Sequence, residues 1–139
     1  MSSEIHFLNS SGLVRLEDCL QEVELDVIRE VYDEISKDPY FPTNCGTAAV
    51  ALGEKGFSIQ LGRFYTDYPD DLRLVPERNY RIHRWNRLGG IFIDQTAFQF
   101  NPFLYENLRL PEGIIIFDSH HTIARRYMSE AQFRRRMDL

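Results

Sequence analysis

The sequence has few of the features that mark disulfide-rich, membrane-bound or nucleic-acid-binding proteins. Its 139 residues include two cysteines, Cys19 and Cys45, too few for a disulfide framework. No apolar run approaches the roughly 18 residues of a membrane span. The first residues lack the basic and then apolar segments of a secretory signal. Acidic residues outnumber basic ones by 21 to 16, and the net charge of −5 disfavours nucleic acid and anionic membranes as partners. We therefore expect a cytoplasmic protein, or one exported by a route without such a signal.

Length and composition predict one domain over residues 1–139, because 43% hydrophobic residues suffice for a core. An apolar stripe at helical spacing predicts a helix from Leu16 to about Ser36, formed by Leu16, Leu20, Val23, Val27, Val31 and Ile35. A second, short helix is expected from Cys45 to about Leu52, where Gly53 and Gly56 follow. A last helix is expected from Glu130 to Met137, capped by Ser129.

The strands follow from alternation of apolar and polar residues and from turn signals. They are expected at 57–65, 80–86, 91–95, 114–118 and, less regularly, 122–127. The segment 66–79 is rich in turn residues and is expected to be a flexible excursion. The fold class is therefore α+β, with the helices packed on an antiparallel sheet of four or five strands.

Cys45 stands at the start of a helix, where the helix dipole stabilises a thiolate. A nucleophilic thiol also needs a neighbouring base, and the residue favoured for this role is His83 on the strand 80–86. Alternation places Trp85 on the same face of that strand, where its ring could shield the imidazole from water.

Asp94 is the residue expected to orient His83. Gly89 and Gly90 turn a hairpin, and a register with Asn86 opposite Ile91 places His83 opposite Asp94. Opposed residues on paired strands have Cβ atoms about 5 Å apart, close enough for a hydrogen bond between the side chains.

Three stretches together resemble the transglutaminase-like branch of the papain-like thiol enzymes. They are NCGTAAVAL, HRWN and IFIDQT, with Gln99-Phe100 as in some bacterial members, and they lie within about residues 40–101. The resemblance implies a papain-like or transglutaminase-like core, with Cys45 as nucleophile, His83 as general base and then acid, and Asp94 as orienter. It also implies a protein or peptide substrate, in some reactions an amine acceptor, and neither a metal nor a cofactor.

The sequence departs from the papain pattern at the position that supplies an oxyanion donor. Papain-like proteases carry a glutamine six residues before the cysteine, where this chain has Pro39. A second donor must therefore come from elsewhere, and the residues that could bind the oxyanion or the substrate are Tyr40, Asn44, Trp85, Gln95 and Gln99. The departure favours glutamine deamidation or transglutaminase-type acyl transfer over peptide cleavage.

Other interpretations stay open on the sequence. A cysteine protease or another thiol hydrolase would use the same three residues, and a papain-like fold could also be a non-catalytic protein-binding module. The stretch FDSHHT holds Asp118, His120 and His121, which could form half of a metal site or supply a different base for Cys45.

Overall fold

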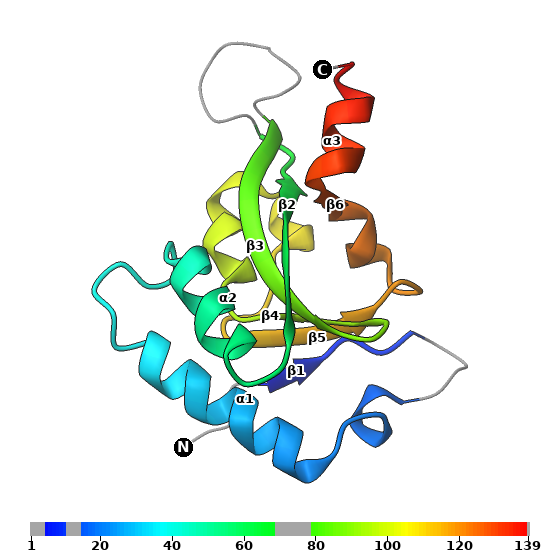
Figure 1. The fold of residues 1–139 in the computed structure, drawn as a ribbon. Coiled ribbons are helices and arrows are strands. Elements are labelled where there is room, and N and C mark those ends of the chain that lie inside the picture. The colour runs from blue at the N-terminus through cyan, green and yellow to red at the C-terminus, as the bar shows by residue number, and fades with distance from the viewer. Residues whose placement is uncertain (1–4, 11–14, 69–78, 139) are drawn as a thin grey trace.

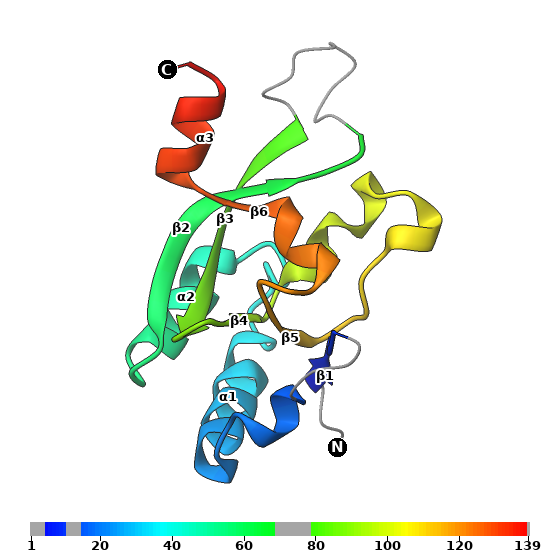
Figure 2. The same cartoon turned by 90° about the vertical axis from the view of Figure 1, so that its right-hand side faces the viewer.

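The fold is built on one curved mixed sheet whose two faces both carry other elements (Figures 1 and 2). The computed structural model describes residues 5–10, 15–68 and 79–138. The α-helices are α1 (Glu22–Ile35), α2 (Cys45–Gly53) and α3 (Glu130–Arg136). The strands are β1 (Ile5–Phe7), β2 (Ser58–Tyr65), β3 (Tyr80–Leu88), β4 (Ile91–Asp94), β5 (Ile114–Asp118) and β6 (Tyr127–Ser129). Short 3-10 segments are η1 (Leu16–Asp18), η3 (Ala97–Phe103), η4 (Glu106–Leu108) and η5 (Thr122–Arg126).

The sheet is larger than expected and it is not wholly antiparallel. Its six strands lie in the order β1-β5-β4-β3-β2-β6, and β1 pairs with β5 in parallel. The expectation of four or five antiparallel strands is therefore wrong, although the α+β class fits. The two additional edge strands have three residues each, too short to show an alternating pattern. The strand expected at 122–127 is instead η5 followed by β6.

The hairpin of β3 and β4 has a register different from the predicted one. Its turn consists of Gly89 and Gly90 alone, with Leu88 paired to Ile91 and Asn86 to Ile93. Gly89 has φ of +59°, a left-handed conformation that glycine adopts without steric cost. Because the turn has two residues, every partner lies two positions later than the predicted register would place it.

The first long helix is shorter than predicted, and the residues that it buries are not all those of the predicted apolar stripe. α1 begins at Glu22 behind a capping box of Gln21 and Glu24, and the preceding turn is η1. Its buried residues are Leu25, Ile28, Val31, Tyr32 and Ile35. Val23, a member of the predicted stripe, is 62% exposed. Cys19 lies outside the helix and is exposed.

Apolar residues pack on both faces of the sheet, and β5 shows this most clearly. Ile114 and Ile116 join the cluster formed with α1 and α2, whereas Ile115 and Phe117 join a second, aromatic cluster. Residues 114–117 are all fully buried, since successive side chains point to opposite faces. In Figure 2, α1 and α2 lie on one side of the sheet, and η5 with the segment after β4 lies on the other.

Two further expectations concern the membrane and the segment 66–79. None of the helices in the described residues is long and apolar enough to cross a membrane. Most of the predicted flexible excursion, residues 69–78, lies outside the described residues.

Candidate active site

Cys45 is the first residue of α2, and the small residues after it let the helix approach the sheet closely. Ala48 and Ala49 are buried at 2% and 1% exposure, and α2 packs against β3 (Figure 1). The Asn44 side chain does not cap the helix, and the first hydrogen bond of α2 runs from Ala48 N to Asn44 O. The backbone N–H groups of the first turn are therefore without a partner within the helix. The Cys45 thiol, half-buried, lies at this end.

His83 is fully buried in β3, and one of its ring nitrogens is bonded to Asp94. Its Nε2 lies 2.6 Å from Asp94 Oδ2, and both side chains are at most 1% exposed. Nδ1 is buried and has no conventional hydrogen-bond partner among the described residues. Since Nε2 is occupied, Nδ1 is the nitrogen that remains for the Cys45 thiol, with which the ring interacts.

The pair of His83 and Asp94 forms although these residues are not directly opposed. The observed register, continued past Asn86 and Ile93, would place Trp85 opposite Asp94. His83 is then the diagonal neighbour, whose Cβ is about 7–8 Å away, a gap that an imidazole and a carboxylate can span. The predicted partners are thus brought together by a different register.

Asp94 accepts hydrogen bonds from three groups. Besides His83, its Oδ2 accepts from the Tyr127 hydroxyl at 2.5 Å, and its Oδ1 accepts from the Thr96 N–H at 3.0 Å. Both oxygens of the Asp94 carboxylate are therefore held by hydrogen bonds, which fixes its orientation. Tyr127 was not predicted as a site residue, because it lies 33 positions later in a short edge strand and belongs to no motif with Asp94.

The charges of the site favour a thiolate beside an imidazolium. Burial alone would lower the pKa of His83, but the Asp94 carboxylate and the Cys45 sulfur raise it from 6.5 to about 9. Burial raises the pKa of the Cys45 thiol, yet the neighbouring His83 imidazole, with the Arg84 backbone N–H, outweighs burial and lowers it. Tyr127 stays protonated, because burial and then the Asp94 charge raise its pKa well above 10.

Aromatic rings enclose the imidazole. Trp85 is stacked on His83 at 5.6 Å between ring centroids, and Phe100 meets the ring edge-to-face at 4.9 Å. Tyr127 packs against both His83 and Trp85. The rings keep water from His83, which leaves the electrostatic pull of Asp94 poorly screened.

The structure distributes the remaining predicted site residues unevenly. Asn44 is buried at the start of α2, with Nδ2 bonded to Ile35 O and Oδ1 without a described partner. Gln95 Nε2 donates to Ala48 O and so ties the segment after β4 to α2. Gln99 Nε2 donates to Thr96 Oγ1, and Thr96 in turn donates its N–H to Asp94. Tyr40 is 75% exposed in the loop before α2.

The stretch FDSHHT forms a turn after β5 and contributes nothing to the Cys45 site. Asp118 Oδ1 accepts from the His120 N–H, and His121 Nδ1 accepts from the Ile123 N–H. No cluster of three or more histidine, cysteine or acidic residues that could hold a metal occurs in the described residues. The imidazole beside Cys45 is thus that of His83, not of His120 or His121.

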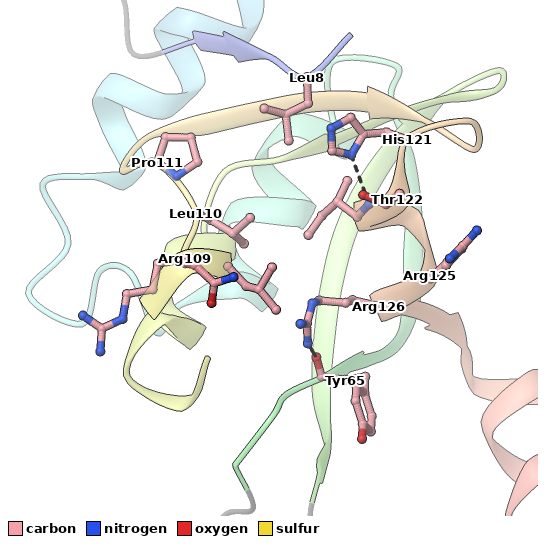
Figure 3. Close-up of a pocket in the computed structure, with 12 residues that line it drawn as sticks. Leu8, Tyr65, Arg109, Leu110, Pro111, His121, Thr122, Arg125 and Arg126 are labelled. Atoms are coloured by element: carbon pink, nitrogen blue, oxygen red, sulfur yellow. Dashed lines mark hydrogen bonds between the residues drawn. The ribbon is translucent and has the colours of Figure 1, made fainter. Parts of the chain in front are cut away.

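A cavity of about 510 Å³ lies beside this turn, between β1, η4 and η5 (Figure 3). Leu8, Leu110 and Ile123 contribute apolar walls. Arg109 and Arg125 point away from it, and Arg126 is bonded to Tyr65 O and Asp67 (Figure 3). The cavity includes neither Cys45 nor His83, so it is separate from the candidate active site.

A second cavity, an open groove of about 610 Å³, adjoins Cys45. Arg84 of β3 lines one side of the groove. The other lining residues belong to α2 or directly flank it, and they are Asn44, Gly46, Thr47, Val50, Ala51 and Glu54. The groove reaches both neighbours of Cys45 in the chain, although Cys45 itself does not line it.

Comparison with known proteins finds no protein-family model, no curated protein and no solved structure that matches this chain. The function is therefore inferred from the geometry and chemistry of the site.

Proposed function

We propose that this chain is a cysteine-dependent enzyme that attacks a glutamine carboxamide and forms a thioester acyl-enzyme. Cys45 is the nucleophile, His83 the general acid and base, and Asp94 the residue that orients His83. The observation that carries the proposal is the buried imidazole held by Asp94 on one side and coupled to a half-buried thiol on the other. A structural cysteine would be an inert, buried hydrophobe, without a charged base beside it.

In the first half-reaction, the Cys45 thiolate adds to the carbonyl carbon of the carboxamide. The negative charge that develops on the carbonyl oxygen faces the start of α2, where free backbone N–H groups of the first turn can donate. The C–N bond then breaks, and the protonated His83 gives its Nδ1 proton to the nitrogen that leaves as ammonia. The product is a thioester between Cys45 and the glutamyl carbonyl.

In the second half-reaction, His83 takes a proton from the molecule that attacks the thioester. Attack by water gives glutamate, and attack by a primary amine gives an isopeptide bond. Either reaction returns the proton to the imidazole and frees the Cys45 thiolate. Asp94 keeps its charge throughout, and stabilises each imidazolium form of His83.

The preference for a carboxamide rests on the absence of the papain-type donor at Pro39 together with the HRWN and IFIDQT stretches. The side-chain amides of Asn44 and Gln95 already donate to Ile35 O and Ala48 O. Donors for the oxyanion are then backbone N–H groups at the start of α2.

The test is to incubate the protein with a mixed protein extract and to measure ammonia release and glutamine-to-glutamate conversion by mass spectrometry. We expect both with the parent protein and with Cys19→Ser, and neither with Cys45→Ala. New peptide termini without ammonia release would refute attack on a carboxamide and indicate that the enzyme cleaves peptide bonds. The absence of any Cys45-dependent change would contradict an enzymatic role and favour the binding-module interpretation.

A further inference from the structure

The face of the sheet next to Cys45 carries unusually exposed apolar side chains. Ile59 and Leu61 of β2 are 48% and 44% exposed, and Ile82 of β3 is 63% exposed. Cross-strand pairing of Leu61 with Arg84 and of Arg63 with Ile82 places them on one face. Val50 of α2, 49% exposed, borders the same face. Neighbouring exposed apolar residues of this kind mark interaction surfaces.

Two helices limit this face and leave its middle uncovered. On one side α2 is fixed by Asn86, whose Nδ2 donates to Ala49 O. On the other side α3 is fixed by Arg63, which pairs with Glu130 and lies over the Phe133 ring. Leu61, Ile82 and Arg84 belong to β2 and β3, and Figure 1 shows these strands running between the two helices.

Arg84 places a positive charge against Gly46, the residue that follows Cys45. A Cβ added to Gly46 would lie 2.7 Å from Arg84 Nη1, so the guanidinium rests on the residue that follows Cys45. The side chain is exposed, and within the described residues it makes no ion pair. By contrast, Arg63 is paired with Glu130 and Arg126 with Asp67. An exposed guanidinium with no ion pair among the described residues is suited to bind a carboxylate.

We propose that Ile59, Leu61, Ile82, Arg84 and Val50, here called the docking face, bind the protein substrate of the Cys45 site. The bound segment carries a carboxylate next to the reacting residue and an apolar side chain beyond it. The carboxylate pairs with Arg84, whose guanidinium lies against Gly46, the residue after Cys45. The apolar side chain packs on Leu61 and Ile82. The proposal deepens the proposed function, on which it rests for the identity of the reacting residue.

The attraction of Arg84 for a carboxylate is tested with two alkylating probes of similar size, anionic iodoacetate and neutral iodoacetamide. Rates at Cys45 are measured in a Cys19→Ser background, because Cys19 is exposed and would otherwise react. We expect Arg84→Gln to lower the ratio of the iodoacetate to the iodoacetamide rate about fivefold, and the effect to shrink with salt. The matched control is Arg109→Gln, an exposed arginine that lines the other cavity. An unchanged ratio in Arg84→Gln would overturn the carboxylate site.

The substrate segment is tested by binding, so that the result does not depend on turnover. Fluorescein-labelled peptides with one glutamine flanked by glutamate and leucine are titrated into Cys45→Ala protein. Counterparts carry lysine in place of glutamate, or serine in place of leucine. We expect the first peptide to bind at least tenfold more tightly than either counterpart. Arg84→Glu should reverse the glutamate preference, and Ile82→Thr should remove the leucine preference, whereas Leu108→Ser on η4 should change neither.

The two proposals fail in different ways. Equal binding of all three peptides would overturn the docking face, whatever the ammonia assay gives. Selective binding without Cys45-dependent ammonia release would refute the carboxamide chemistry and leave the docking face supported. A uniform loss of rate on all peptides in Arg84→Gln, with binding unchanged, would assign Arg84 to the oxyanion and overturn its docking role.

Discussion

Replacing Asp94 with asparagine changes the charge at the centre of the site while keeping its shape. In the parent protein, Asp94 accepts from His83, Tyr127 and Thr96 at 2.6, 2.5 and 3.0 Å. An asparagine has one acceptor oxygen and one NH₂ group, so it cannot accept all three bonds. If the oxygen keeps the Thr96 N–H, the NH₂ group faces His83 Nε2. That nitrogen must then accept, and the ring proton moves to Nδ1, the side of Cys45.

The magnitude follows from the pKa of His83. Its rise from 6.5 to about 9 depends chiefly on Asp94, against the opposing effect of burial. A shift of this size corresponds to roughly 3 kcal/mol, or on the order of 100-fold in the protonation equilibrium. Without the carboxylate the imidazolium is lost at neutral pH, and the thiolate of Cys45 loses the cation that lowers its pKa.

We therefore expect Asp94→Asn to slow the alkylation of Cys45 by iodoacetamide at pH 7 by about 100-fold. The assay follows Cys45 by mass spectrometry between pH 5 and about 10 in a Cys19→Ser background, with circular dichroism to show that the variant is folded. Asp33→Asn, the same substitution at an exposed site on α1, serves as the control. A folded Asp94→Asn protein whose rate profile superposes on that of the parent would refute the reasoning.

Three further predictions concern the stability of the fold. In Cys45→Ala, where the imidazole titrates without the thiol, the raised pKa of His83 should stabilise the fold fully below pH 6.5. This stabilisation should be lost as the pH rises through the pKa of His83 in the folded variant, which Asp94 raises but which lacks the further raising effect of Cys45. The expected fall in the free energy of unfolding is roughly 1–3 kcal/mol in urea titrations, and His83→Gln should flatten it; a rise with pH would contradict the prediction. Tyr127→Phe removes a buried hydrogen bond to a carboxylate and should cost about 1–3 kcal/mol in the same titration, against little change for Tyr65→Phe, which is 39% exposed; equal losses would argue against the Asp94 bond. Gly62→Ala should lower the melting temperature, because its Cβ would overlap Met128 O and separate β2 from β6. The control Gly90→Ala, whose Cβ would have no atom within 4 Å, should have little effect. Similar melting temperatures for the two variants would show that β6 moves away without loss of stability.

Residues 40–101 could be interpreted from sequence because their signals are local. A small-residue helix after Cys45, alternation in β2 and β3, and the Gly89-Gly90 turn each depend on neighbours in the chain. The turn signal identified the hairpin but not its register, since the choice between a two-residue and a longer turn shifts each pairing by two positions. His83 and Asp94 meet in spite of this shift because side chains of their length tolerate a diagonal placement.

The contributions from outside this region had no local signal. The parallel pairing of β1 with β5 joins residues more than a hundred positions apart, and three-residue strands carry no readable period. Tyr127 reaches Asp94 only because β6 pairs with β2, a tertiary contact. The free charge of Arg84 was likewise invisible in the sequence, where arginines are abundant and their partners unknown. Cys19 is exposed although it adjoins a predicted apolar stripe, because α1 begins three residues after it.

The bond between Tyr127 and Asp94 has a consequence for the order in which the protein is made. A ribosome that has released the chain through Asp94 has already delivered the thiol, the imidazole and the carboxylate. The strand that supplies the second donor to Asp94 Oδ2 emerges 33 residues later. During that interval the nascent chain lacks the group that fixes the carboxylate, and β2 lacks its partner β6. The complete constellation can therefore assemble only after Tyr127 has been made, 33 residues after Asp94.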